Sequence, residues 1–164
     1  MIFTLIGMAG SGKSVIGRRL ARSLGYSCID IDTIIESAQN ERLAILVGKL
    51  GDKGFLDLEE RTICDLQVKD NTIISTGGSA IYSERAMNHL KSFSKMVYLD
   101  TPYIDIVRRV GNKPRGIIGL NNSDLKGVFE ERASLYEKYA DITIDCSHST
   151  ISRVLDRVMY NIKS

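Results

Sequence analysis

The chain has 164 residues, the size of one ordinary domain, of which 43% are hydrophobic and 26% charged. This balance is typical of a soluble globular protein, and no apolar run approaches the ~20 residues that a membrane-spanning helix needs. The formal net charge of +2 is too small to indicate nucleic-acid binding. Three widely spaced cysteines without a C-x-x-C pair indicate neither a disulfide framework nor a zinc site. We therefore expect a single domain over residues 1–164 that binds neither nucleic acid nor membranes. We also expect it to be cytoplasmic and monomeric.

Strands and helices alternate along the sequence. An apolar strand over residues 2–6 has no basic leader before it, so we expect no export signal. A glycine-rich loop over 7–14 joins it to a helix that ends at Gly25. The later elements are a strand at 27–32, a helix at 33–38, two helices with a bent connection within 42–68, strands at 71–75, 95–99 and 141–145, a helix that runs to 110, and a closing helix at 150–162. This alternation predicts an α/β fold with a five-stranded parallel sheet flanked by helices.

One segment, residues 111–124, breaks the alternation. It carries three glycines, one proline, two basic residues and only three apolar side chains. Because so little apolar surface would hold it in one place, we predict a mobile lid, with an ordinary surface loop as the alternative. Lys113 and Arg115 favour the lid, since a cover over phosphates needs cations next to a hinge.

Residues 7–14 (GMAGSGKS) match the pattern G-x-x-x-x-G-K-[ST] between a predicted strand and a predicted helix. The backbone N–H groups of such a loop hold phosphate oxygens, and the helix N-terminus adds the positive end of its dipole. We predict that Lys13 bridges the β- and γ-phosphates of ATP and that Ser14 gives its hydroxyl to Mg²⁺. The pattern indicates a P-loop NTPase-like nucleotide site. The alternative is a relic loop that no longer binds nucleotide.

Asp30 and Asp32 are predicted at the C-terminal end of the second strand, beside the P-loop, where open α/β sheets bind their ligands. If the strand stays extended, their spacing directs both side chains to one side. One carboxylate can hold the hydration shell of Mg²⁺, and the other can accept a hydrogen bond or the proton from the attacking hydroxyl. The alternative is that one of them only caps the next helix.

Further candidates follow the third strand and flank the lid. The glycines of residues 76–79 (TGGS) free backbone amides for a substrate's hydroxyls, although turn chemistry alone would also explain them. Arg109 precedes the lid and Arg132 follows it. A guanidinium is suited to planar contact with a carboxylate or phosphate, or to stacking on adenine, while a solvated surface charge is the alternative for each.

Together these motifs resemble the shikimate kinase family of small P-loop kinases, over nearly the whole chain. The resemblance implies a nucleotide-binding core, a helical substrate-binding segment at about 31–62 and a lid at about 111–124. It also implies ATP-dependent phosphorylation of the 3-hydroxyl of shikimate, in aromatic amino-acid (chorismate) biosynthesis, with Mg²⁺ as the metal. Shikimate would then be the small-molecule partner.

The resemblance also assigns roles to single residues. It places Asp30 in the magnesium shell through water, and makes Asp32 the partner of the substrate hydroxyls. It makes Arg115 the lid arginine that reaches the phosphates, packs Arg109 on adenine, and gives Arg132 the substrate carboxylate. The expected catalytic residues are Lys13, Asp32 and Arg115; the nucleotide contacts are Gly10, Ser11, Gly12, Lys13, Ser14, Val15, Arg109 and Arg115; the substrate contacts are Asp32, Gly77, Gly78, Ser79, Arg132 and the position of Leu56.

Two positions of the substrate half depart from the family pattern. The family usually has F-R-x-x-E where this chain has FLDLE at 55–59, so that Leu56 replaces an arginine, and Ser79 replaces the last residue of a glycine triplet. Losing one charge-assisted contact to a carboxylate costs on the order of 1.5–3 kcal/mol, which is enough to change a substrate. Lys53, one helical turn before Leu56, is a candidate to supply the missing charge. Ser79 could clash with a substrate or offer it a new hydrogen bond.

Alternative functions therefore stay open. Leu56 and Ser79 favour a related phosphotransferase that acts on a different small hydroxy compound. A nucleotide-binding module with a degraded substrate site is a third hypothesis, but such a module would tolerate loss of Asp32, which is present here. A nucleotide kinase is less favoured, because the sequence shows no aromatic-rich pocket for a base.

Overall fold

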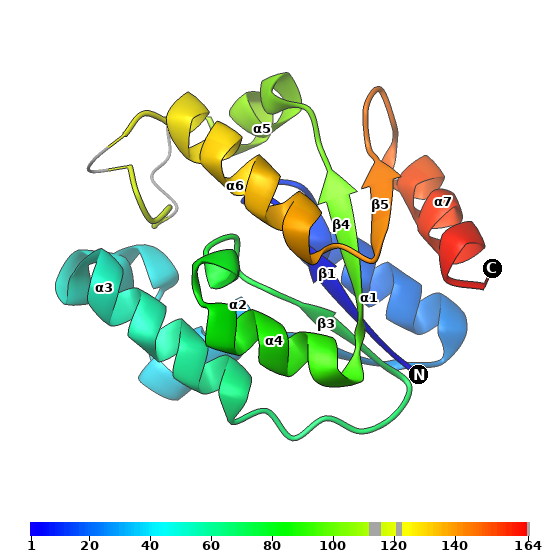
Figure 1. Cartoon of the computed structure of the whole chain (residues 1–164), viewed down its shortest axis with the longest axis horizontal. Helices are drawn as coiled ribbons and strands as arrows, with labels where there is room; N and C mark the ends of the chain where they lie inside the picture. The colour runs from blue at the N-terminus through cyan, green and yellow to red at the C-terminus, as the bar shows by residue number, and fades with distance from the viewer. Residues whose placement is uncertain (112–115, 121–122, 164) are drawn as a thin grey trace.

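A five-stranded parallel sheet forms the centre of the computed structural model, which describes residues 1–111, 116–120 and 123–163. The strand order is β2-β3-β1-β4-β5, and each pair of neighbours is parallel (Figure 1). The strands are β1 (Ile2–Ile6), β2 (Ser27–Asp30), β3 (Thr72–Ser75), β4 (Lys95–Asp100) and β5 (Ile142–Asp145). The predicted α/β fold is confirmed.

Helices cover both faces of the sheet (Figure 1). They are α1 (Lys13–Leu24), α2 (Ile31–Gln39), α3 (Leu43–Cys64), α4 (Glu84–Phe93), α5 (Tyr103–Val110), α6 (Leu125–Tyr139) and α7 (Ile151–Lys163), with a short 3₁₀ helix, η1 (Ala80–Tyr82). On one face α1 packs against α7, and on the other α3, α4 and α6 come together. Within the described ranges, no helix is both long enough and apolar enough to cross a membrane.

The two faces of β1 bury separate hydrophobic clusters, because successive side chains of a strand point to opposite sides. Phe3 and Leu5 join the cluster beneath α1 and α7, which we call the rear cluster. Ile6 joins the larger cluster beneath α3, α4 and α6, which we call the front cluster. Both clusters include residues of β1, the strand that leads into the P-loop. The hydrophobic core therefore fixes the position at which that loop begins.

The second strand ends earlier than the sequence predicts. β2 stops at Asp30 and α2 begins at Ile31, whereas we expected a strand to residue 32. Asp30 keeps an extended backbone, and its Oδ1 accepts a hydrogen bond from the N–H of Thr33 at 3.2 Å. This N-cap starts the helix two residues early, so Asp32 lies in the first turn of α2 and not on the strand.

The region between residues 42 and 94 also differs from the prediction in detail. The bent connection is a kink within α3 at Gly51, where φ is 68° and ψ is 174°. The sequence pattern predicted no helix between residues 76 and 94, but η1 and α4 lie there. The Oγ of Ser83 caps α4 by accepting from the N–H of Ala86 at 3.0 Å. The helix then buries Met87 and Leu90 against the front cluster.

Part of the predicted lid packs onto α3. Ile117 and Ile118 are 8% and 4% exposed and belong to the front cluster, so this segment holds more buried apolar surface than its composition indicated. The N–H of Gly119 donates to Asp52 Oδ2 at 3.0 Å. Residues 112–115 and 121–122 lie outside the described residues, and these include Lys113 and Arg115. The mobility of the lid stays a prediction.

Candidate active site

The P-loop curls between β1 and α1. Gly7, Gly10 and Gly12 have φ angles of 148°, 83° and 95°. Residues that carry a Cβ atom rarely adopt these positive values. Gly12 is also the N-cap of α1, so the unpaired N–H groups of the first helical turn face the space above the loop. The local sequence therefore builds an anion site from backbone alone.

Lys13 lies over this loop in a buried position. Its Nζ donates to the carbonyl oxygens of Gly7 at 2.7 Å and Met8 at 2.9 Å. Burial lowers the pKa of the Lys13 ammonium to about 8, although the carboxylate of Asp32 opposes that shift. The ammonium is therefore held by backbone carbonyl oxygens in a poorly hydrated position, where a charge acts strongly on its neighbours.

A cavity of about 610 Å³ opens above the P-loop. Its lining combines loop residues with residues from other elements, namely Ala9, Gly10, Gly12, Lys13, Ser14, Val15, Asp32, Glu36, Arg42, Leu43, Ala44, Thr76, Gly78 and Arg109. Arg109 is exposed at its edge, and its Nη1 donates to the carbonyl of Gly10 at 3.1 Å. Of the predicted nucleotide contacts, Ser11 is buried in the loop, where its Oγ lies 3.5 Å from Lys13 Nζ. Arg115 lies outside the described residues.

A second cavity, of about 50 Å³, adjoins the first. It is lined by Ala9, Asp32, Leu43, Phe55, Gly77, Gly78, Ser79, Gly116, Ile117, Ile118 and Arg132. Asp32, Ala9, Leu43 and Gly78 line both cavities. The structure therefore brings most of the predicted substrate contacts together beside the P-loop. We call this smaller space the substrate-side cavity.

Asp32 and Asp30 take different positions. Asp32 faces both cavities, and burial raises the pKa of its carboxyl group to about 6, against the attraction of Lys13. Asp30 caps α2 and lines neither cavity. The helix-capping alternative thus applies to Asp30. Its second oxygen accepts no hydrogen bond from the described residues.

Arg132 is the only fully buried arginine of the described residues, at 1% exposure. Its Nη2 donates to the carbonyl of Ile118 at 2.7 Å and its Nε to Tyr82 Oη at 3.3 Å. The guanidinium also lies 5.2 Å from the centre of the Tyr82 ring. Nη1 lies beside Gly78, on the wall of the substrate-side cavity, where it makes a long contact of 4.0 Å to the Sδ of Met8.

Several residues that support this site carry no motif that would predict a role for them. Tyr136 donates its hydroxyl to the carbonyl of Gly78 at 2.6 Å, and Tyr82 holds Arg132. Glu59, 1% exposed, accepts a hydrogen bond from Ser79 Oγ at 2.6 Å. Burial raises the pKa of Glu59 to about 7, while the Ser79 hydrogen bond lowers it.

The close packing around Gly77 explains why a glycine occupies this position after β3. A Cβ atom at this position would clash with Glu59 Oε1 and would lie 2.9 Å from Asp32 Oδ1. The backbone of residue 77 therefore lies directly against two carboxyl groups. Any larger residue would push apart the wall of the substrate-side cavity.

Of the two residues that depart from the family pattern, Ser79 lines the substrate-side cavity and Leu56 does not. Ser79 lines the substrate-side cavity but bonds to Glu59, so it causes no clash there. Leu56 is partly buried and packs against the front cluster without lining the cavity. Lys53 lies beyond the kink of α3 and is exposed.

Known proteins resemble this chain along its whole length. A family model described as shikimate kinase matches residues 9–163. The shikimate kinase of Persephonella marina is 31% identical over 160 residues, which cover 97% of each chain. The solved shikimate kinase of Acinetobacter baumannii in complex with shikimate has a TM-score of 0.89 at 26% identity, and covers 99% of this chain and 92% of that chain. That of Aquifex aeolicus has a TM-score of 0.84 at 31% identity, with 99% and 96% covered. The resemblance is confirmed: the chain belongs to the shikimate kinase family, a family of ATP-dependent phosphotransferases.

Proposed function

We propose that this chain transfers the γ-phosphoryl group of ATP to the 3-hydroxyl of shikimate, in the biosynthesis of aromatic amino acids through chorismate. The observation that carries the proposal is the pair of adjoining cavities that share Asp32. One cavity holds the P-loop and Lys13, and the other ends at the buried Arg132. The two cavities thus place three groups side by side in space: a cation for the carboxylate, a proton acceptor for the hydroxyl and a cradle for the phosphates. Phosphorylation of a hydroxy acid requires this arrangement.

The larger cavity fits the phosphates of ATP. The backbone N–H groups of residues 10–15 would hold phosphate oxygens at the N-terminus of α1, and Arg109 would pack on the adenine. Mg²⁺ favours oxygen ligands and keeps several waters, which suits the Ser14 hydroxyl in this cavity and the spare oxygen of Asp30 acting through water. When bound, the ion would neutralise charge on the β- and γ-phosphates.

Catalysis would then rest on positioning and on fixed charge. Asp32, whose pKa is raised to about 6, would orient the attacking hydroxyl and accept its proton. Lys13 would stabilise the charge that develops on the transferred group. We assign the same task to Arg115, in the part of the lid that the structure does not describe.

On the substrate side, Arg132 would bind the carboxylate through Nη1, and the backbone at Gly77 and Gly78 would contact the hydroxyls. With Leu56 in place of an arginine, this leaves a single buried cation for the carboxylate among the residues that line the cavity. Lys53 would have to reach in from the surface to add a second.

The alternative with a degraded substrate site is not favoured, because Asp32, Arg132 and their supporting contacts are assembled around the cavity. A different small hydroxy acid stays the second candidate, favoured by Leu56 alone. We propose that the chain acts as a monomer. The three cysteines are free thiols, as a reducing cytoplasm would keep them.

A coupled ADP-release assay with Mg-ATP tests the proposal. Shikimate is compared with a panel of other hydroxy acids and polyols at equal concentration. Saturable turnover with shikimate at a sub-millimolar KM supports the proposed function. Binding of ATP without turnover of shikimate, together with turnover of another panel member, would assign the chain to the second candidate.

A further inference from the structure

Ser79 and Glu59 form a buried pair beside the substrate-side cavity. The Oγ of Ser79 donates to Glu59 Oε2 at 2.6 Å, and the two residues are 6% and 1% exposed. The other carboxyl oxygen, Glu59 Oε1, is buried and has no hydrogen-bond partner among the described residues. Within that part of the chain, the carboxyl group of Glu59 therefore depends on one hydroxyl for its hydrogen bonding.

The helix that carries Glu59 gives it no cation. Leu56 lies three residues earlier on α3, and side chains at this spacing are neighbours on a helix. A cation at position 56 would reach the carboxylate, but the neutral Leu56 packs into the front cluster. Glu59 has no ion pair within 4.0 Å in the described ranges. The buried carboxyl group thus lacks the charged partner that such groups ordinarily have.

The position of Glu59 matters for the reacting end of the site. The backbone of Gly77 lies against Glu59 Oε1 on one side and close to Asp32 Oδ1. A carboxyl group free to move would displace the backbone that faces the substrate. Fixing Glu59 therefore fixes the wall of the cavity next to Asp32.

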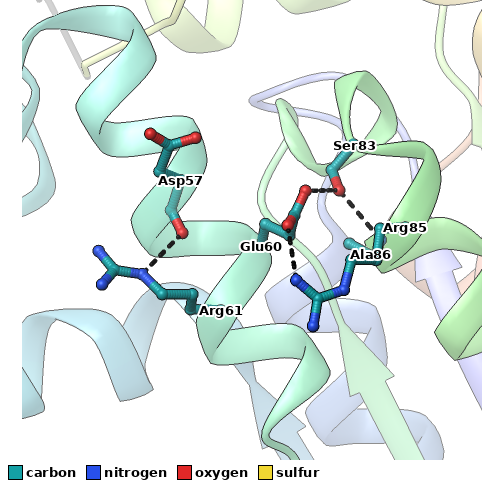
Figure 2. Close-up of polar contacts among 6 residues, drawn as sticks. All are labelled: Asp57, Glu60, Arg61, Ser83, Arg85 and Ala86. Atoms are coloured by element: carbon teal, nitrogen blue, oxygen red, sulfur yellow. Dashed lines mark hydrogen bonds and ion pairs between the residues drawn. The ribbon is translucent and has the colours of Figure 1, made fainter.

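The neighbouring glutamate makes a parallel contact on the outside of the same segment. Glu60 accepts a hydrogen bond from the hydroxyl of Ser83 at 2.6 Å and pairs with Arg85 at 3.3 Å. Figure 2 shows both contacts. Ser79 and Ser83 flank η1, so consecutive glutamates of α3 hold its two ends. Only the inner contact borders the substrate-side cavity, and the outer one is therefore a matched control.

We propose that Ser79 is a positioning residue that holds Glu59 in place of a cation at position 56, so that Leu56 and Ser79 are linked departures and not independent ones. The hydroxyl at residue 79 and the apolar side chain at residue 56 would then have to change together. The effect on a hydroxy-acid substrate rests on the proposed function, whereas the pairing itself does not.

A titration of Glu59 tests the pairing without turnover. The groups that act on its charge come from several elements, and they are Lys13, Asp32, Ser79, Arg132 and Tyr136. Carbon-detected NMR of the side-chain carboxyl group in Ser79→Ala should show a higher pKa, because the hydroxyl stabilises the ionised form. Leu56→Arg in the Ser79→Ala background should lower that pKa again. Ser83→Ala should leave it unchanged.

Kinetics with Mg-ATP and shikimate test the consequence. Ser79→Ala should raise the KM for shikimate about tenfold with little change in the KM for ATP, as expected for one lost hydrogen bond to a charged group. Leu56→Arg should recover most of that loss in the Ser79→Ala background and change the unmodified chain less. Ser83→Ala, which removes the cap of α4, should lower the melting temperature and leave the KM unchanged.

Several outcomes would overturn the proposal. They are a Glu59 pKa that does not respond to Ser79→Ala, equal rises in KM in both serine variants, and independent effects of the changes at 56 and 79. If the unmodified chain does not turn over shikimate, the proposed function fails, and the NMR titration still decides whether Ser79 holds Glu59.

Discussion

Asp52 accepts a hydrogen bond from the N–H of Gly119 at 3.0 Å and so joins α3 to the segment that follows the predicted lid arginine. Asp52 is the first residue after the kink at Gly51. The contact therefore ties the bend of the substrate-binding segment to the base of the lid.

Proteolysis would report on this contact. We expect Mg-ATP with shikimate to slow cleavage within residues 111–124, and Asp52→Ala to weaken the protection severalfold, because a hydrogen bond to a charged group is lost. Limited trypsin digestion followed by mass spectrometry measures both. Asp57→Ala, an exposed acidic residue on the same helix, is the control. Cleavage that is insensitive to the ligands would argue for an ordinary surface loop.

Lys13→Ala should reduce kcat by about a hundredfold or more, because the cation that faces the transferred phosphoryl group is lost. The variant should stay folded, since burial already penalises the ammonium, as its lowered pKa indicates. Steady-state kinetics and thermal unfolding measure the two effects. Lys126→Ala removes an exposed lysine of α6 and should change neither. Full activity of Lys13→Ala would refute the assigned role.

Asp32→Asn should lower kcat much more than it weakens ATP binding, because an amide keeps the shape of the side chain but cannot accept the proton of the hydroxyl. Calorimetric titration with Mg-ATP, beside turnover with shikimate, separates the two quantities. Equal losses in both would move Asp32 from the substrate hydroxyl to the metal shell.

Glu59 predicts a pH dependence of stability. Burial raises its pKa from 4.5 to about 7, so between these values the folded chain keeps a proton that the unfolded chain has lost. The contribution of Glu59 to the free energy of unfolding is thus fully present below pH 4.5, and it is lost as the pH rises through about 7. Relative to Glu59→Gln, the unmodified chain should lose about 3 kcal/mol of unfolding free energy between about pH 4 and pH 8. Urea denaturation at both pH values measures the difference, and parallel profiles would contradict it.

Lys53→Ala tests whether an exposed lysine replaces the arginine that Leu56 displaces. If Lys53 reaches the substrate, the KM for shikimate should rise severalfold while the KM for ATP stays unchanged, because only the carboxylate loses a partner. Lys49→Ala is the matched control, as Lys49 lies before the kink of α3 and pairs with Glu41. An unchanged KM in Lys53→Ala would leave Arg132 as the sole cation for the carboxylate.

The P-loop and the sheet could be predicted because their signals are local. A glycine that needs a positive φ and a strand of apolar residues are each determined by a few neighbours in sequence. The predicted boundary between β2 and α2 was wrong by two residues. Asp30 accepts a hydrogen bond from the N–H of Thr33, and this helix cap outweighs the strand pattern of the sequence.

The sequence around Glu59 contains a signal of its burial. On α3 it lies between the buried Phe55 and Ile63, at spacings of four residues, so its position belongs to an apolar stripe. An ionisable residue in such a stripe indicates a buried functional group. Arg132 lies in the same kind of stripe on α6, between the buried Val128 and Tyr136.

The partners of these residues could not be predicted from one sequence. Ser79 lies twenty residues from Glu59, and Tyr82 fifty residues from Arg132. Such contacts depend on how α3, η1 and α6 pack around the front cluster, and no local pattern specifies them.

The cap at the start of α2 couples the position of Asp32 to that of Asp30. Asp30 fixes where the helix begins, and Asp32 lies in its first turn, so the direction of the second carboxylate depends on the hydrogen bond of the first. A glutamate at position 30 would preserve the negative charge, but glutamate is not among the residues that cap helices well. Such a replacement would release the helix start and carry Asp32 away from both cavities. Position 30 is therefore constrained by helix geometry as well as by charge, and lengthening its side chain by one methylene would move the carboxylate of Asp32.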